Sequence, residues 1–187
     1  MIKIIGCGNI LRRDDGIGVY VIEELEKMSL SKNVELIDAG TRGLDMVSFL
    51  EGAQKVVIID AVKNHGKPGT IYRFDVDEKE EIETYQPEFV STHEFNWEDT
   101  LVIGRKILGA QFPKKVTFFG IEIENVETGL GLSPALKESL YKVVNVIQKE
   151  LEEGYNVVHR IQKELDDEEL SQKKEAYTND KTKLLGV

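Results

Sequence analysis

The chain has 187 residues and a formal net charge of −10, with 41% hydrophobic and 31% charged residues. This balance is typical of a soluble domain with a full core, and the acidic charge disfavours a nucleic-acid partner because basic residues form no concentrated patch. The single cysteine, Cys7, excludes an internal disulfide and suits a reducing cytoplasm. No apolar run is long enough to span a bilayer, and Ile2–Ile5 is too short for a signal peptide, so we expect none.

The first 18 residues predict a strand, a glycine-rich turn and the start of a helix. Ile2–Ile5 is an apolar, β-branched run, and Gly6 and Gly8 then allow a sharp turn and the close approach of another group. Two adjacent acids, Asp14 and Asp15, follow just before a helical pattern begins. Two acids in one turn repel each other unless they are solvated or paired, so they call for a chemical explanation.

Three interpretations of this turn compete. A dinucleotide site would hold a pyrophosphate, but the third glycine of that fingerprint is missing after Gly6-x-Gly8 and the two acids would repel phosphate. A cation site is favoured instead, because carboxylates in such a turn are natural metal ligands. The remaining alternative is that Asp14 or Asp15 simply caps the helix that follows.

Hydrophobic periodicity predicts alternating strands and helices along the chain. The expected strands are 2–5, 34–37, 55–62, 70–76 and 115–121. The expected helices are 17–28, 42–50, a segment carrying Trp97, Leu101 and Leu108, and one that starts at Ser133-Pro134. Strand 70–76 follows its predecessor so closely that it should return antiparallel, as a hairpin or an edge strand.

This alternation predicts an α/β fold, a three-layer sandwich. Its sheet should be mostly parallel, with about five strands, one antiparallel edge strand and helices on both faces. We expect this domain to span residues 1–153. Residues 154–187 are a charged C-terminal extension, predicted to be helical at first and then disordered from about Asp166, where no apolar period remains.

Three acids are expected to meet at one edge of this sheet. Asp15 follows the first strand, Asp38 ends the second and Asp60 ends the third, and open α/β sheets bind ligands beyond the carboxyl ends of their strands. Each acid could instead cap a helix, although no helix follows Asp60. Among the histidines, His93 stands at an element junction, whereas His65 and His159 are expected to be solvated. Asp15, Asp60 and His93 would suit nickel or zinc and leave a coordination position open.

These motifs together resemble the hydrogenase maturation protease family. They are Gly6-Cys-Gly8-Asn9-Ile-Leu-x-x-Asp14-Asp15-Gly16-x-Gly18, Asp38-Ala-Gly40-Thr41-x-Gly43, Ile58-Ile59-Asp60-Ala61, His93, Phe112-Pro113-Lys114-Lys115 and Gly131-Leu132-Ser133-Pro134. The resemblance covers about residues 1–150. Members of this family are endopeptidases that remove a C-terminal extension from the large subunit of nickel–iron hydrogenases after nickel insertion.

The resemblance also implies roles for single residues. The family's metal-binding positions are matched by Asp15, Asp60 and His93. Asp38 matches a motif that is linked to activity or substrate fit. The resemblance therefore implies that the catalytic residues are Asp15, Asp38, Asp60 and His93. It implies that nickel comes with the substrate rather than as a permanent cofactor. The attacking water could be activated by the metal or by Asp38 or Asp15, giving a metal-assisted or aspartic-type hydrolase. Cys7 is expected to pack in the strand and not to act as a nucleophile.

We therefore expect a monomeric cytoplasmic protease whose partner is a hydrogenase large-subunit precursor, with no nucleic acid and no membrane insertion. Two alternatives stay open. A non-catalytic nickel-binding maturation chaperone could use the same three ligands, and only a cleavage assay would separate the two. A nucleotide-binding oxidoreductase is less favoured, and a titration with NAD or NADP would test it.

Overall fold

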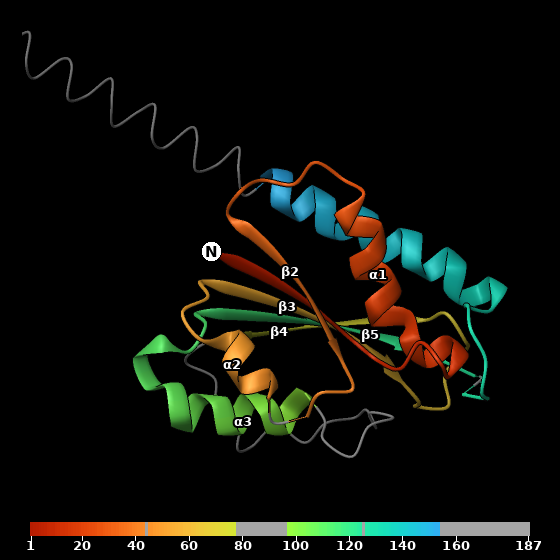
Figure 1. The fold of residues 1–187 in the computed structure, drawn as a ribbon, viewed down its shortest axis with the longest axis horizontal. Helices are drawn as coiled ribbons and strands as arrows, with labels where there is room; N and C mark the ends of the chain where they lie inside the picture. The colour runs from red at the N-terminus through yellow and green to blue at the C-terminus, as the bar shows by residue number, and fades with distance from the viewer. Residues whose placement is uncertain (44, 78–96, 125, 154–187) are drawn as a thin grey trace, which may run out of the picture. The chain divides into compact units, whose positions relative to one another are not determined.

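The computed structural model describes residues 1–43, 45–77, 97–124 and 126–153 and contains a five-stranded sheet in the order β2-β1-β3-β5-β4 (Figure 1). The strands are β1 (Ile2–Cys7), β2 (Val34–Gly40), β3 (Lys55–Val62), β4 (Ile71–Asp77) and β5 (Lys115–Glu122). β1 pairs in parallel with β2 and β3, β3 pairs in parallel with β5, and β4 runs antiparallel to β5. The predicted mostly parallel sheet with an antiparallel edge strand is confirmed.

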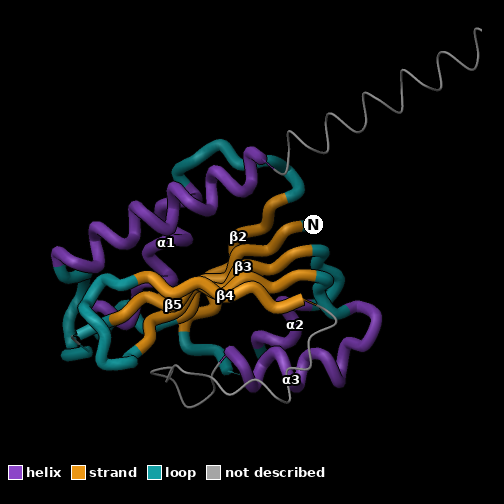
Figure 2. Tube along the Cα trace, turned by 180° about the vertical axis from the view of Figure 1, so that it is seen from behind, coloured by secondary structure: helices purple, strands orange, loops and turns teal. Residues whose placement is uncertain are grey.

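Helices cover both faces of this sheet, which confirms the predicted layers. The short 3-10 helix η1 (Arg13–Gly16) leads into α1 (Ile17–Glu26) on one face. Figure 2 shows α2 (Met46–Leu50) and α3 (Trp97–Leu108) on the other face, and the 3-10 helix η3 (Gly109–Gln111) follows α3. In the described part of the chain, no helix combines the length and the apolar content that crossing a membrane requires.

A further helix begins at Pro134 and continues to residue 153. Ser133 precedes it, and the Ser133 Oγ accepts a long hydrogen bond of 3.5 Å from the Leu136 N–H, as the predicted Ser-Pro start requires. The chain divides within this helix into two units, Met1–Val144 and Asn145–Val187, and the sheet belongs to the first. Residues 154–187 lie outside the described residues, so the proposed extension stays a prediction.

The apolar runs of β3 and β5 form the centre of the core, because both strands are buried along almost their whole length. Ile58 and Val62 belong to a cluster with Leu50. In the same cluster Trp97 stacks on Phe118, with ring centroids 4.1 Å apart. Burial of a large apolar side chain stabilises a fold by about 1.5–3 kcal/mol. The packing of these apolar side chains therefore stabilises the sheet whose carboxyl edge carries Asp60.

One predicted helix is shorter than expected. The helix expected over 42–50 begins only at Met46, so residues 42, 43 and 45 were assigned wrongly, and residue 44 lies outside the described residues. Gly40 has a positive φ of 52°, and the Arg42 N–H donates to the Ala39 carbonyl at 3.0 Å, which closes a turn after β2. Because glycine is a poor helix former, Gly43 adds to the preference for a turn at this point.

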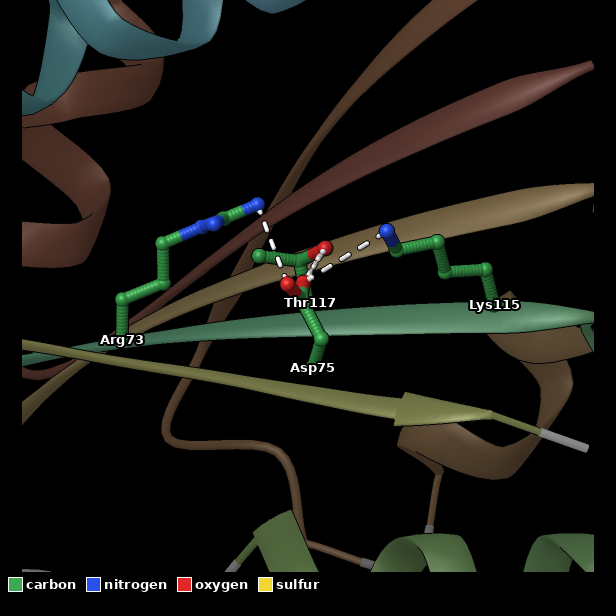
Figure 3. A network of polar contacts seen from close by, with 4 residues as sticks. All are labelled: Arg73, Asp75, Lys115 and Thr117. Carbon is green, nitrogen blue, oxygen red and sulfur yellow. Dashed lines mark hydrogen bonds and ion pairs between the residues drawn. The ribbon is translucent and has the colours of Figure 1, made fainter. Parts of the chain in front are cut away.

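The strand expected over 70–76 is β4, which lies at the edge of the sheet and does not form a hairpin with β3. β5 lies between β3 and β4, because the apolar β3 is buried on both faces and takes a parallel neighbour on each side. β4 carries charges that suit an edge. Figure 3 shows Asp75 accepting a hydrogen bond of 2.7 Å from the Thr117 Oγ1, with the Arg73 Nη2 at 3.2 Å and the Lys115 Nζ at 3.9 Å. The contacts with Thr117 and Lys115 of β5 fasten β4 to the sheet.

Candidate active site

Asp15 lies in η1, and glycines hold this segment against the sheet. A β-carbon on Gly8 would fall on the carbonyl oxygen of Asp15, and one on Gly18 would fall on that of Ile59. Gly8 also has a φ of 129°, which side chains with a β-carbon rarely adopt. The glycines that the sequence places around the two acids therefore allow η1 and the start of α1 to press onto the ends of β1 and β3.

Asp15 and Asp60 are both buried at this edge. Asp15 is 0% exposed, and its Oδ2 accepts the Asn9 N–H at 3.1 Å. Asp60 is 3% exposed, and its Oδ1 accepts the Ala61 N–H at 2.8 Å, while η1 packs against the strand that carries it. Burying an ionised carboxylate is costly unless hydrogen bonds, a proton or a cation compensate the charge. Two such groups in neighbouring elements make this edge suited to a cation.

Asp38 reaches the same edge from β2 but is exposed. Its Oδ1 accepts the Gly40 N–H at 2.8 Å, which fixes the carboxylate in a short turn. Gly6 of β1 pairs in register with Asp38 on one side and with Ile59 on the other, so Asp38 and Asp60 flank the end of β1. Neither acid ends its strand as predicted, because β2 and β3 continue to Gly40 and Val62.

The Cys7 thiol is buried and is influenced by the negative charges of Asp38 and Asp60. It is 4% exposed, and its Sγ lies 3.8 Å from the Met46 Sδ. Burial raises the pKa of the Cys7 thiol well above its ordinary value, and the negative charges of Asp60 and Asp38 raise that pKa further. A buried thiol held in its neutral form packs as a small apolar group, as expected from the sequence, and is a poor nucleophile.

The capping interpretation of Asp14 and Asp15 is wrong for the helix that follows them. The N-cap of α1 is Gly16, which makes no side-chain cap hydrogen bond. Asp14 is 1% exposed, and its Oδ1 instead accepts the Ser133 N–H at 2.7 Å. One carboxylate of the pair is thus bonded to the start of the helix at residue 134, while the other accepts a hydrogen bond from the glycine-rich turn.

His93 lies outside the described residues, so its place relative to Asp15 and Asp60 stays a prediction. Within residues 1–43, 45–77, 97–124 and 126–153, no three or more His, Cys, Asp or Glu side chains are grouped so as to hold a metal ion. The two buried carboxylates supply oxygen donors that suit hard and borderline metals, and a complete site would need further ligands from His93 or from a substrate. His65 is exposed, as expected.

Glu122 is a buried acid that the sequence reasoning missed. It ends β5, is 1% exposed, and accepts the Asn64 N–H at 2.9 Å and the Tyr72 hydroxyl at 3.2 Å. Burial raises the pKa of the Tyr72 phenol, and the Glu122 charge adds to that rise. Its position directly after a buried apolar run was the signal that could have revealed it. Because its oxygens are engaged by the loop after β3 and by Tyr72 of β4, we assign Glu122 a structural role.

A model of the hydrogenase maturation protease family matches residues 19–150. This chain belongs to that family. It is 30% identical over 154 residues to the hydrogenase 2 maturation protease of Escherichia coli, a match that covers 81% of this chain and 91% of that protein. A shorter match, 46% identical over 86 residues, covers 45% of this chain and 56% of a relative from Methanocaldococcus jannaschii.

The fold agrees with the family assignment. The solved structure of the hydrogenase maturating endopeptidase HybD from E. coli is similar with a TM-score of 0.69 and 30% identity, covering 82% of this chain and 93% of that one. As a hydrogenase maturation protease, the chain is a hydrolase of the endopeptidase type with a role in hydrogenase maturation. The family therefore favours the protease over the nucleotide-binding oxidoreductase.

Proposed function

We propose that this chain removes the C-terminal extension from the nickel-loaded precursor of a nickel–iron hydrogenase large subunit, acting as a monomer in the cytoplasm. The observation that carries the proposal is the pair of buried carboxylates, Asp15 and Asp60, at the sheet edge of a hydrogenase maturation protease. The exposed Asp38 supports it, because a carboxylate at that edge can meet a large substrate.

Nickel enters this proposal as part of the substrate. Carboxylate oxygens and an imidazole nitrogen are suitable ligands for it, so Asp15, Asp60 and His93 would bind nickel that the precursor already holds. A cation that reaches two buried carboxylates interacts strongly with them, because the dielectric constant around buried groups is low. A precursor without nickel offers no such gain, so the same contacts would select the loaded form.

Hydrolysis also needs a group that takes a proton from the attacking water. As the water oxygen bonds to the scissile carbonyl carbon, its proton passes to a base and later to the departing amine. Asp38 suits this role better than Asp15, because it is exposed and its Oδ1 is fixed by the Gly40 N–H. Polarisation of the water by the substrate's nickel is the other possible route.

The direct test is incubation of the purified nickel-loaded precursor with the protein, followed by intact-mass measurement of the large subunit. We expect the mass to fall by that of one C-terminal peptide, with the peptide recovered in solution. An unchanged mass would contradict the proposed protease function. Stable binding of the precursor without a change in mass would support the non-catalytic nickel-binding chaperone instead.

A further inference from the structure

A loop far along the chain holds the segment that carries Asp15. The Arg13 N–H donates to the Gly129 carbonyl at 2.9 Å, and the Gly129 N–H donates to the Leu11 carbonyl at 2.8 Å. Further along the loop, the Gly131 N–H donates to the Tyr20 hydroxyl at 3.0 Å. Residues 126–133 therefore form a strap across the turn that leads into η1.

Asp14, a buried residue of η1, is bonded to the last residue of this strap. Its Oδ1 accepts the Ser133 N–H at 2.7 Å across 119 positions of sequence. Its Oδ2 is buried and has no hydrogen-bond partner among the described residues. An unsatisfied buried carboxylate oxygen destabilises a fold, so such a group calls for an explanation beyond stability.

Helix capping alone does not explain Asp14. Ser133 already provides the cap of the helix at residue 134, since its Oγ faces the Leu136 N–H at 3.5 Å. Pro134, the first helical residue, has no N–H that needs a partner. The hydrogen bond that Asp14 accepts from Ser133 is therefore additional to an ordinary helix start. It anchors η1, in which Asp14 and Asp15 are consecutive.

We infer that Asp14 is a positioning residue, which fixes the Asp15 carboxylate at the sheet edge by anchoring η1 to Ser133. The inference rests on the proposed function, in which Asp15 meets the substrate's metal. Asp15 has its own bond from the Asn9 N–H at 3.1 Å, so the orientation of η1 decides whether that contact and the direction of the carboxylate are kept. Small displacements of a reacting group can reduce a rate by about 100-fold.

Three variants separate positioning from stability. Asp14→Ala removes the bond to Ser133, whereas Asp14→Asn keeps an oxygen that can accept it and replaces the unpartnered Oδ2 by an amide nitrogen. Ser139→Ala is the matched control, because the Ser139 Oγ bonds the Gly69 carbonyl at 2.6 Å and fastens the same helix far from Asp15 in sequence. We expect Asp14→Ala to lower kcat about 10- to 100-fold with little change in KM, and Asp14→Asn and Ser139→Ala to stay close to wild type.

A second readout does not depend on cleavage. Hydrogen exchange of the Asn9 amide reports the contact between Asn9 and Asp15, and we expect it to become about 10-fold faster in Asp14→Ala but to stay unchanged in the other two variants. Unchanged Asn9 exchange in Asp14→Ala would overturn the inference, as would an Asp14→Asn variant as impaired as Asp14→Ala. Failure of the wild-type protein to cleave the precursor would overturn the proposed function instead, and Asn9 exchange would still decide the role of Asp14.

Discussion

Gly18, in the first turn of α1, lies so close to β3 that a β-carbon there would fall on the carbonyl oxygen of Ile59. Ile59 directly precedes Asp60, and Asp15 stands three positions before Gly18. Because a β-carbon on Gly18 would also fall on the carbonyl oxygen of Cys7, the start of α1 is held against both β1 and the strand that carries Asp60. This close approach links a small residue in the sequence pattern to the geometry of the candidate active site.

Substitution of this glycine should affect both stability and cleavage. Gly18→Ala should destabilise the fold by about 1–3 kcal/mol, because rigid backbone atoms must move to admit the methyl group. It should also slow cleavage, because η1 and Asp15 move with α1. Urea unfolding and the cleavage rate of the nickel-loaded precursor measure the two effects.

Gly104→Ala is the matched control, a helical glycine in α3 whose added β-carbon would meet the flexible end of Leu50. It should keep wild-type cleavage and lose less stability than Gly18→Ala, because a side-chain end moves more easily than backbone and alanine favours the helix. Equal effects of the two substitutions would show that the Gly18 contact has no special role.

Loss of the buried charge at Asp60 should stop processing without unfolding the protein. Asp60→Asn keeps the size of the side chain, and we expect at least about a 100-fold loss of cleavage because the electrostatic attraction for a cation disappears. Its melting temperature should stay close to that of wild type, because Asn keeps the size of the side chain and an oxygen that can accept the Ala61 N–H. Asp75→Asn, on the edge strand, is the control and should cleave normally.

The same experiment with His93→Ala tests the third predicted ligand. We expect a loss of cleavage similar to that of Asp60→Asn, since an imidazole nitrogen would be missing from the set that meets the substrate's nickel. A His93→Ala protein that processes the precursor at the wild-type rate would remove His93 from the site.

The buried thiol should influence alkaline stability but not catalysis. Because the folded state raises the pKa of Cys7 above its ordinary value of 9.0, the native protein keeps a proton that the unfolded chain loses. Stability should therefore be complete below that pH and fall as the pH rises above it. Cys7→Ala should lessen this fall in urea unfolding followed from about pH 8 to about pH 10.5 and should cleave like wild type. Loss of cleavage would mean that Cys7 takes part in the reaction.

Much of the fold was predictable because the strongest strands leave a clear pattern. The run Lys55–Val62 is continuous and mostly β-branched, and the structure gives β3 the same bounds as the sequence. The late start of α2 was harder to foresee, because the turn that delays it depends on the backbone of Gly40. The insertion of β5 between β3 and β4 depends on long-range pairing, which local periodicity does not encode.

The candidate site was predictable to a similar extent. Asp15, Asp38 and Asp60 could be assigned to one edge, because parallel strands end together and glycines mark the tight turn. The bond between Asp14 and Ser133 could not be predicted, because it joins residues 119 positions apart through a backbone N–H that leaves no signature in the sequence. Glu122 was missed because its partners, the Asn64 N–H and the Tyr72 hydroxyl, become neighbours only in the folded sheet.

Recognition of nickel held by the substrate can be measured directly. The measurement is the rate at which the purified protein shortens one large-subunit precursor, prepared once with nickel and once without it, with intact mass as the readout. We expect the nickel-loaded precursor to lose its C-terminal peptide and the nickel-free precursor to keep it, because only the loaded form supplies the cation that Asp15 and Asp60 are proposed to bind. Equal rates for the two forms would contradict this account.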